Sequence, residues 1–331
     1  MTRASGAPEV ATTDAARLAL DALDAAEVER LARALCGGGE HDVDAPAWVS
    51  RARSSWDELP LALRRRVRAF RRHSGPSGSL VISGLPVGED LPATPATADS
   101  VQRKGTISAA VLTMAACGLG DPAAYLAEKS GALVQDVVPV AGLESFSGNA
   151  GSALLTFHNE NAFHEHEPDY VLLLCLRADS ERTAGLRTAC LREVLPLLCD
   201  ADIETLFAPE FILAPPPSFG SDDEQRSPQP VLRGAPEDPD MRMATIATTP
   251  LTARATAALA AFGAACDAAG HVILLAPGDM AILDNRVTAH GRTAFRPRYD
   301  GADRWVQRTF VIADLRRSRD HRPHDGYVLT R

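Results

Sequence analysis

The stretch TFHNENAFHEHEPDYVLLLCL, from Thr156 to Leu176, decides the fold class. Its first half carries three histidines and three glutamates, and its second half is a continuous apolar run typical of a buried strand. Along a strand, residues i and i+2 point to the same face, so His158 and Glu160 project together as two adjacent metal ligands would. The sequence therefore predicts a buried sheet with a polar, metal-binding mouth.

A third metal ligand has to come from another part of the chain. His290 is the best candidate, because in MAILDNRVTAHGR it follows an apolar strand and a turn and precedes a glycine. Two imidazoles and one carboxylate form the facial triad of non-haem Fe(II) oxygenases, which leaves coordination positions open for substrate and oxygen. A His and a Glu at this spacing are a weak signal alone, since such residues often form surface polar clusters. We interpret His164 and His166 in that second way, as mostly solvated residues at the rim.

Two arginines follow the third candidate ligand. Arg304, fourteen residues beyond His290, is placed to form a bidentate pair with a carboxylate, which an oxygenase that uses 2-oxoglutarate requires. The alternative for Arg304 is a surface ion pair with Asp300 or Asp303. Arg308 has the same strand parity as Arg304 and is a candidate for holding a second carboxylate.

Composition limits the class of protein. The chain has 331 residues, 45% of them hydrophobic, which is enough for a large domain with an ample core. The net charge of −9 argues against nucleic acid as a partner, because nucleic-acid-binding domains are usually basic. No CxxC pair, no N-terminal apolar signal segment and no run of about 18 apolar residues occurs. We therefore expect a cytoplasmic protein with no membrane association.

The expected secondary structure changes along the chain. Apolar spacing predicts helices at 13–36, 58–72, 94–120 and 251–270. Thr13 or Asp14 is expected to cap the first helix. After about residue 130, short strand-like segments separated by turn signals predict an antiparallel sandwich or barrel braced by helices. We expect a helical N-terminal region, 1–75, that packs on a core domain, 76–331, in which the Pro/Ser-rich loop 215–230 forms a lid.

Five separated motifs occur in an order that resembles a known family. His158-x-Glu160, AFH, DYVLLLCLR, DNRVTAHGR and the DGADRW…DLRRSR ending are similar to clavaminate synthase-like Fe(II)/2-oxoglutarate oxygenases of the taurine dioxygenase superfamily. The branch that the chain resembles contains free-amino-acid 3-hydroxylases, whose substrates include arginine and asparagine. The resemblance covers about residues 79–319. It implies a mainly β fold with flanking helices, built on a double-stranded β-helix (jelly-roll) core.

The resemblance also implies roles for individual residues at the metal and the cosubstrate. His158, Glu160 and His290 match the catalytic Fe(II) ligands. Arg304 matches the arginine that holds the C5 carboxylate of 2-oxoglutarate, and Thr188 matches a hydroxyl residue that supports the same carboxylate. Molecular oxygen is the second cosubstrate that the family uses.

On the substrate side, the resemblance implies that Gln135, Glu160 and Arg308 hold the amine and carboxylate of an amino acid. The segment 240–250, DMRMATIATTP, lacks the acidic residues that would grasp a guanidinium group. The pocket is therefore expected to take a more neutral side chain, and Arg242 would favour an acidic or amide group.

The activity implied is hydroxylation of an sp³ carbon, Cβ, of an L-amino acid in specialised-metabolite (antibiotic) biosynthesis. The partner would be a small-molecule amino-acid substrate, free or tethered to a carrier protein. Two alternatives stay open: desaturation or cyclisation of the same type of substrate, and a non-catalytic barrel that binds a ligand. Retention of all three metal ligands together with Arg304 favours an active oxygenase, since fold alone does not establish function.

Overall fold

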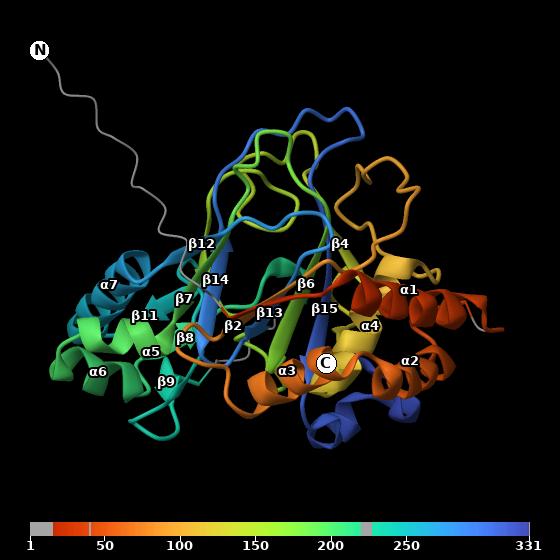
Figure 1. The fold of residues 1–331 in the computed structure, drawn as a ribbon. Coiled ribbons are helices and arrows are strands. Elements are labelled where there is room, and N and C mark those ends of the chain that lie inside the picture. The colour runs from red at the N-terminus through yellow and green to blue at the C-terminus, as the bar shows by residue number, and fades with distance from the viewer. Residues whose placement is uncertain (1–15, 40, 220–226, 331) are drawn as a thin grey trace, which may run out of the picture.

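Two β-sheets face each other, and helices cover the outer face of each sheet (Figure 1). The computed structural model describes residues 16–39, 41–219 and 227–330. The core between the sheets contains side chains from both of them. The result is a sheet-rich α/β arrangement of four layers, helices, sheet, sheet and helices, as the strand-rich second half of the chain predicted.

The larger sheet contains eight strands. They are β1 (Ala16–Ala19), β2 (Ser79–Ser83), β3 (Asp121–Tyr125), β4 (Gln135–Val137), β6 (Tyr170–Arg177), β13 (Met280–Asp284), β15 (Trp305–Ile312) and β16 (Val328–Leu329). The order is β1-β2-β13-β6-β15-β3-β16, and β4 also pairs with β15. All these pairs are antiparallel except β1 with β2 and β16 with β3.

The smaller sheet has the order β12-β7-β14-β5. Its strands are β12 (His271–Ile273), β7 (Leu186–Cys190), β14 (Thr288–Arg292) and β5 (Leu155–His158). Two further short ladders pair β8 (Phe211–Leu213) with β11 (Thr248–Pro250), and β9 (Leu232–Arg233) with β10 (Asp240–Met241).

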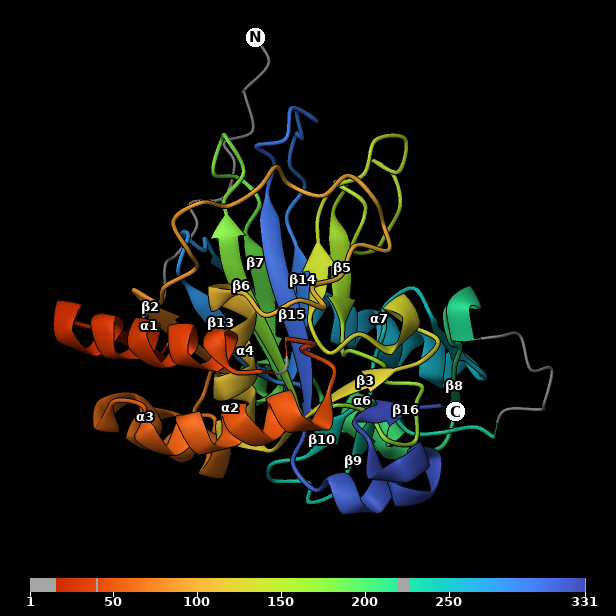
Figure 2. The same ribbon diagram turned by 90° about the vertical axis from the view of Figure 1, so that its right-hand side faces the viewer.

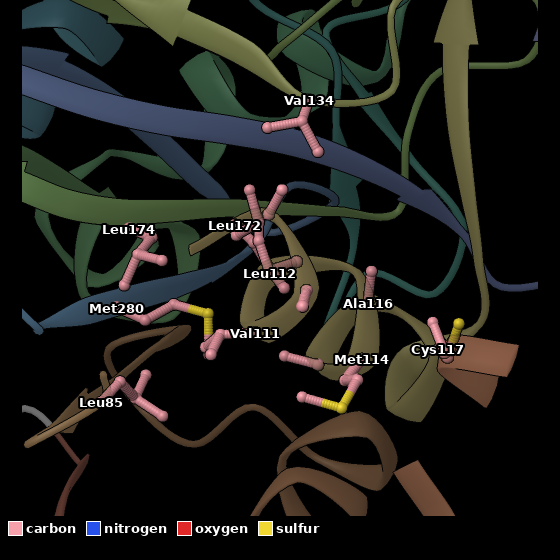
Figure 3. Close-up of a cluster of buried hydrophobic side chains, with 14 of the residues drawn as sticks. Leu85, Val111, Leu112, Met114, Ala116, Cys117, Val134, Leu172, Leu174 and Met280 are labelled. Atoms are coloured by element: carbon pink, nitrogen blue, oxygen red, sulfur yellow. The ribbon is translucent and has the colours of Figure 1, made fainter. Parts of the chain in front are cut away.

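The apolar run after the histidine-rich segment forms β6, which is buried on both faces as predicted. Successive side chains of a strand point to opposite faces. Leu173 lies in the core between the sheets, which also contains Leu186 of β7. Leu172 and Leu174 lie in the core under the helices, near Met280 of the neighbouring strand (Figure 3). A strand buried on both faces explains why this segment shows no polar alternation.

Four helices cover the larger sheet: α1 (Ala22–Gly37), α2 (Pro46–Glu58), α3 (Leu61–Arg72) and α4 (Ile107–Leu119). The α4 helix is buried from Ser108 to Leu119, because it lies between the sheet and the other three helices. Gly118 of α4 is in contact with Trp56 of α2: a Cβ atom at Gly118 would lie 2.4 Å from Cζ2 of the indole. The close approach of these helices therefore depends on the missing side chain.

On the other side of the molecule, α6 (Asp200–Phe207) and α7 (Ala253–Ala268) pack on the outer face of the smaller sheet (Figure 2). The short helix α5 (Leu191–Val194) packs against α7. The 3₁₀ segments are η1 (Lys129–Gly131), η2 (Leu195–Leu197), η3 (Pro217–Phe219), η4 (Leu315–His321) and η5 (Pro323–Asp325). None of the described helices is both long and apolar enough to cross a membrane.

The prediction of a helix at 13–36 is wrong for its first part. Residues Ala16–Ala19 form strand β1, and α1 begins only after Asp21, whose side chain accepts hydrogen bonds from two backbone N–H groups of the first turn. The expected caps, Thr13 and Asp14, lie outside the described residues. The strand pairs in parallel with β2, a long-range interaction that local spacing does not reveal.

The other helix predictions are confirmed to different extents. The helix predicted at 94–120 begins only at Ile107, because Thr106 accepts a hydrogen bond from a first-turn N–H group and so ends the preceding extended segment. The helices at 58–72 and 251–270 are present as α3 and α7. The α2 helix was not predicted, although Pro46 at its first position is a typical start signal.

Candidate active site and metal centre

The three predicted metal ligands lie together at the end of the smaller sheet. His158 is the last residue of β5, and its direct cross-strand neighbour in β14 is His290. The two imidazole ring centroids are 4.5 Å apart, and His290 Nε2 lies 3.5 Å from Oε1 of Glu160. One ligand atom from each residue lies within 4.8 Å of the other two. The structure thus brings the three residues close enough to share one ion.

A network of two asparagines fixes the loop that carries Glu160. The Asn285 side chain accepts a hydrogen bond from Glu160 N (2.9 Å) and donates to the carbonyl oxygens of Glu160 (3.1 Å) and Pro168 (2.8 Å). Asn159 donates to Asn285 O (2.6 Å) and accepts from Met243 N (3.1 Å). Sequence reasoning missed both asparagines as supporting residues, although each lies inside a quoted motif.

Burial and neighbouring charges set the protonation of the ligands. Burial, with the nearby His290 ring, lowers the pKa of His158 to about 4, so its imidazole is neutral at pH 7 and free to bind a metal. Burial raises the pKa of Glu160, but Arg308 and the two imidazoles lower it more, and the carboxylate stays ionised. Two imidazole nitrogens and one anionic oxygen fit an Fe(II) ion of the facial-triad type.

A cavity of about 520 Å³ opens beside the ligands. Glu160 and Arg308 lie in its polar part, and Leu213, Phe219 and Ile246 belong to its apolar wall. The predicted lid, 215–230, contributes residues 215, 216, 218 and 219 to this wall, whereas 220–226 lie outside the described residues. The volume is in the range of pockets that hold small molecules.

Arg308 is the centre of a buried charge cluster in the cavity. It is only 2% exposed, and it donates hydrogen bonds to Oε1 of Glu160 (2.6 Å), to Oε1 of Gln135 (2.5 Å) and to the carboxylate of Glu128. Gln135 is its cross-strand neighbour in β4. Sequence reasoning missed Glu128, because it lies in a loop after β3 with no motif around it. One guanidinium group therefore joins two carboxylates and the amide that the sequence nominated for substrate binding.

Arg304 is also buried, but unlike Arg308 it has no acidic partner: among the described residues no carboxylate lies within ion-pair distance of its guanidinium group. The expected alternative, a surface pair with Asp300, does not form, because Asp300 pairs with Arg298. Burial lowers the pKa of Arg304. A buried guanidinium without an acid partner is a ready site for an anionic ligand.

Arg292 is a second buried arginine next to Arg304, and sequence reasoning missed it. Burial and the nearby charge of Arg304 lower its pKa to about 9. Its Nη2 donates to Ala153 O (3.1 Å), while its Nε atom has no hydrogen-bond partner among the described residues. The signal was present in the motif His-Gly-Arg, since residues i and i+2 of a strand share a face and Arg292 therefore lies on the face of His290.

Thr188, the expected hydroxyl residue, lies on β7 beside one of the metal ligands. It is 1% exposed, and the register of β7 with β14 places it directly opposite His290. Residues directly opposite each other in a sheet point to the same face. Its side chain therefore shares a face of the sheet with His290 and Arg292.

Two expectations about neighbouring residues are wrong. His164 is not solvated: it is 7% exposed and its ring packs edge-on against Tyr125, with centroids 4.8 Å apart. Arg242 does not lie in the cavity wall, and its Nε donates to Glu167 (2.8 Å). The buried Glu167 carboxylate needs a cationic partner, so Arg242 serves this pair and not a substrate side chain.

Comparison with known proteins identifies relatives across nearly the whole chain. A family model described as "Taurine catabolism dioxygenase TauD, TfdA family" matches residues 223–310. The chain is 58% identical over 311 residues to L-asparagine oxygenase of Streptomyces coelicolor, a match that covers 94% of this chain and 93% of that protein. It is 32% identical over 276 residues to clavaminate synthase 2 of Streptomyces clavuligerus, with 82% and 85% covered.

A solved structure is similar over the same length. The crystal structure of an asparagine oxygenase in complex with Fe(II), (2S,3S)-3-hydroxyasparagine and succinate matches with a TM-score of 0.93 and 57% sequence identity. The match covers 95% of this chain and 99% of that chain.

Proposed function

The chain belongs to the clavaminate synthase-like oxygenases of the taurine dioxygenase superfamily, and from this premise we propose that it hydroxylates the Cβ atom of a free L-amino acid. It is a 2-oxoglutarate-dependent dioxygenase, and its cofactors are Fe(II), 2-oxoglutarate and molecular oxygen. The observation that carries the proposal is the His158, Glu160 and His290 cluster beside a cavity that holds Arg308. In this proposal the two facing sheets are the double-stranded β-helix of domain 76–331. The described part of region 1–75, residues 16–39 and 41–75, adds strand β1 to the larger sheet and packs its helices on it.

In the proposed site His158, Glu160 and His290 hold the iron. When bound, the iron with 2-oxoglutarate and oxygen supplies the oxidising power that converts a C–H bond into C–OH. Arg304 binds the far carboxylate of 2-oxoglutarate, because its buried guanidinium lacks an acid partner among the described residues. Thr188 supports the same carboxylate from the neighbouring strand.

The substrate is proposed to enter as a zwitterion. Arg308 binds its α-carboxylate, and the oxygens of Glu128, Glu160 and Gln135 accept hydrogen bonds from its α-ammonium group. These groups carry one positive and two negative charges, so a zwitterion finds a partner for each of its ends. Holding both ends would aim Cβ at the metal, which lowers the barrier by positioning.

The cavity favours an uncharged side chain. Ala244, Thr245, Ile246 and Ala247 form one wall and carry no ionisable group. Apart from the two carboxylates that Arg308 engages, the carboxylate in the described lining is Asp99, which is exposed. L-Asparagine is therefore the first substrate to test, given the relative named for it, and a carrier-tethered amino acid is the next.

The test is succinate release from 2-oxoglutarate, in the presence of Fe(II) and oxygen, across the twenty amino acids with ornithine and citrulline. One neutral amino acid should raise turnover sharply, and its product should gain one oxygen, about 16 mass units. A product lighter by about two hydrogens would replace hydroxylation by desaturation or cyclisation. If neither free nor carrier-tethered amino acids raise turnover, the proposal is wrong and the barrel is a binding protein.

A further inference from the structure

The histidine-rich segment contains residues that the oxygenase site does not use. In His164-Glu165-His166-Glu167, His164 packs against Tyr125, and Glu167 pairs with Arg233 and Arg242. Glu165 and His166 point elsewhere, toward His321 of the C-terminal segment. They do not line the cavity that holds the oxygenase ligands.

These three residues have the geometry of a ligand set. One ligand atom each from Glu165, His166 and His321 lies within 4.8 Å of the other two, and the oxygenase triad meets the same limit. The two imidazole rings are nearly perpendicular, at 85°, with centroids 4.8 Å apart. Ligand atoms of a tetrahedral zinc site are about 3.3 Å apart, given Zn–N bonds of about 2.0 Å, so small side-chain rotations would complete the site.

The environment of His321 differs from that of an ordinary surface histidine. Its Nδ1 atom is buried and has no hydrogen-bond partner among the described residues, although a solvated imidazole would turn toward water. The other ring nitrogen, Nε2, lies 3.6 Å from Oδ2 of Asp320, a contact that orients the ring and leaves Nδ1 to face a metal. Burial lowers the pKa of His166, so its ring is neutral and able to bind a metal at pH 7.

We propose that Glu165, His166 and His321 form a second divalent-metal site, suited to Zn²⁺, outside the oxygenase centre. Two imidazoles and a carboxylate, with a water as the fourth ligand, are a typical zinc donor set. The cavity of about 720 Å³ beside Glu165 and His166 gives solvent and metal access. Its lining contains four arginines and five carboxylates. Three of the arginines have carboxylate partners, since Arg233 and Arg242 pair with Glu167 and Arg286 pairs with Asp284.

The site would connect two distant parts of the chain. His321 ends η4 in the C-terminal segment, while Glu165 and His166 follow Glu160 on the loop between β5 and β6. Tyr125 already fixes this loop, since its hydroxyl group donates to His166 O (2.6 Å). A metal bound here would hold the C-terminal segment against the loop that carries an iron ligand, and would stabilise the fold without touching the substrate.

The experiment counts Zn²⁺ bound per chain by equilibrium dialysis of the full-length protein. Wild type should bind two ions, because Zn²⁺ also enters the oxygenase triad. His158→Ala, His166→Ala and His321→Ala should each bind one tightly, and the double variant His158→Ala/His166→Ala none. His324→Ala is the matched control, since this exposed histidine of the same segment is not in the ligand set, and it should bind two.

The affinity and the environment of the second ion give independent readouts. In the His158→Ala background, Glu165→Gln should weaken Zn²⁺ binding by at least about 10–100-fold. Co²⁺ bound to the same background should show the strong visible absorption of a tetrahedral ion, and this absorption should disappear with His321→Ala. One Zn²⁺ per wild-type chain that is lost completely in His158→Ala would overturn the proposal. Neither count depends on enzymatic turnover, so failure of the oxygenase proposal is a separate result.

Discussion

Arg308 Nη1 lies 2.6 Å from Glu160 Oε1, so the arginine proposed to bind the substrate is hydrogen-bonded directly to a metal ligand. Both side chains are at least nine-tenths buried, and a buried charge pair is stable only when each member keeps a partner. In the proposed binding mode a zwitterionic substrate would supply such partners as it separates the pair, because its carboxylate would bind Arg308 and its ammonium group would bind the carboxylates. Substrate binding and metal geometry would then be coupled through one contact.

The first prediction concerns this contact. Arg308→Lys keeps the charge but loses the fork that reaches Glu160, Gln135 and Glu128 together. We expect kcat/KM for the amino acid to fall at least about 100-fold, mostly through KM, which corresponds to about 2.7 kcal/mol. The KM for 2-oxoglutarate should change little. Arg298→Lys, at an exposed pair with Asp300, is the control, and equal kinetics for both variants would contradict the assignment.

The second prediction separates the two unpaired arginines. Arg304→Gln should raise the KM for 2-oxoglutarate at least about tenfold, because the cosubstrate loses its charged partner. Arg292→Gln should raise the KM for 2-oxoglutarate less, because it removes a positive charge near Arg304 but not the proposed partner of the carboxylate. It should leave the KM for the amino acid unchanged. Steady-state kinetics with 2-oxoglutarate as the varied substrate measures both. An unchanged KM for 2-oxoglutarate in Arg304→Gln would place the cosubstrate elsewhere.

The third prediction contrasts two histidines of the opening stretch. His158→Ala removes an iron ligand, so it should reduce the rate of hydroxylation by more than about 100-fold. Loss of a group that only supports a metal ligand costs up to about 100-fold. His166→Ala should keep most of the activity, since His166 does not line the cavity. The rate of succinate release by both variants, measured at the same Fe(II) concentration, tests this prediction. A larger loss in His166→Ala than in His158→Ala would overturn the metal assignment.

The cluster of His158, Glu160 and His290 could be predicted from sequence by residue type and spacing. The strand-parity argument for Glu160 is wrong, because β5 ends at His158 and Glu160 lies in the following turn, where Asn285 holds its backbone. The Arg308–Glu128 pair could not be predicted, since Glu128 lies in an aperiodic loop and the contact joins residues 180 positions apart. Arg292 was within reach, because the alternation of a strand places it on the face of His290. The structure adds that Arg292 is buried and that its Nε atom has no hydrogen-bond partner in the described part of the chain.

The same limit applies to the fold: elements with a strong local pattern could be predicted, and elements that depend on contacts distant in sequence could not. The doubly buried β6 and the helices α3 and α7 show strong local patterns, and the sequence predicts them. The α4 helix is apolar on all sides, so periodicity does not mark where it begins, and only Thr106 does. Strand β1 is stabilised by its parallel pairing with β2, more than sixty residues away, and its local sequence reads as helical.

The last prediction tests the packing of α4 with a pair of glycines in helices. At Gly118 a Cβ atom would lie 2.4 Å from the ring of Trp56, so Gly118→Ala should destabilise the protein by about 1–3 kcal/mol through overpacking. At Gly263, inside α7, no atom lies within 4 Å of the added Cβ atom, and Gly263→Ala should stabilise by about 0.5–1 kcal/mol through helix propensity. Urea unfolding of both variants gives the two free energies. The same chemical change should thus have opposite signs at the two sites, and destabilisation by both variants, or by neither, would show that contact with Trp56 does not limit how closely α4 approaches α2.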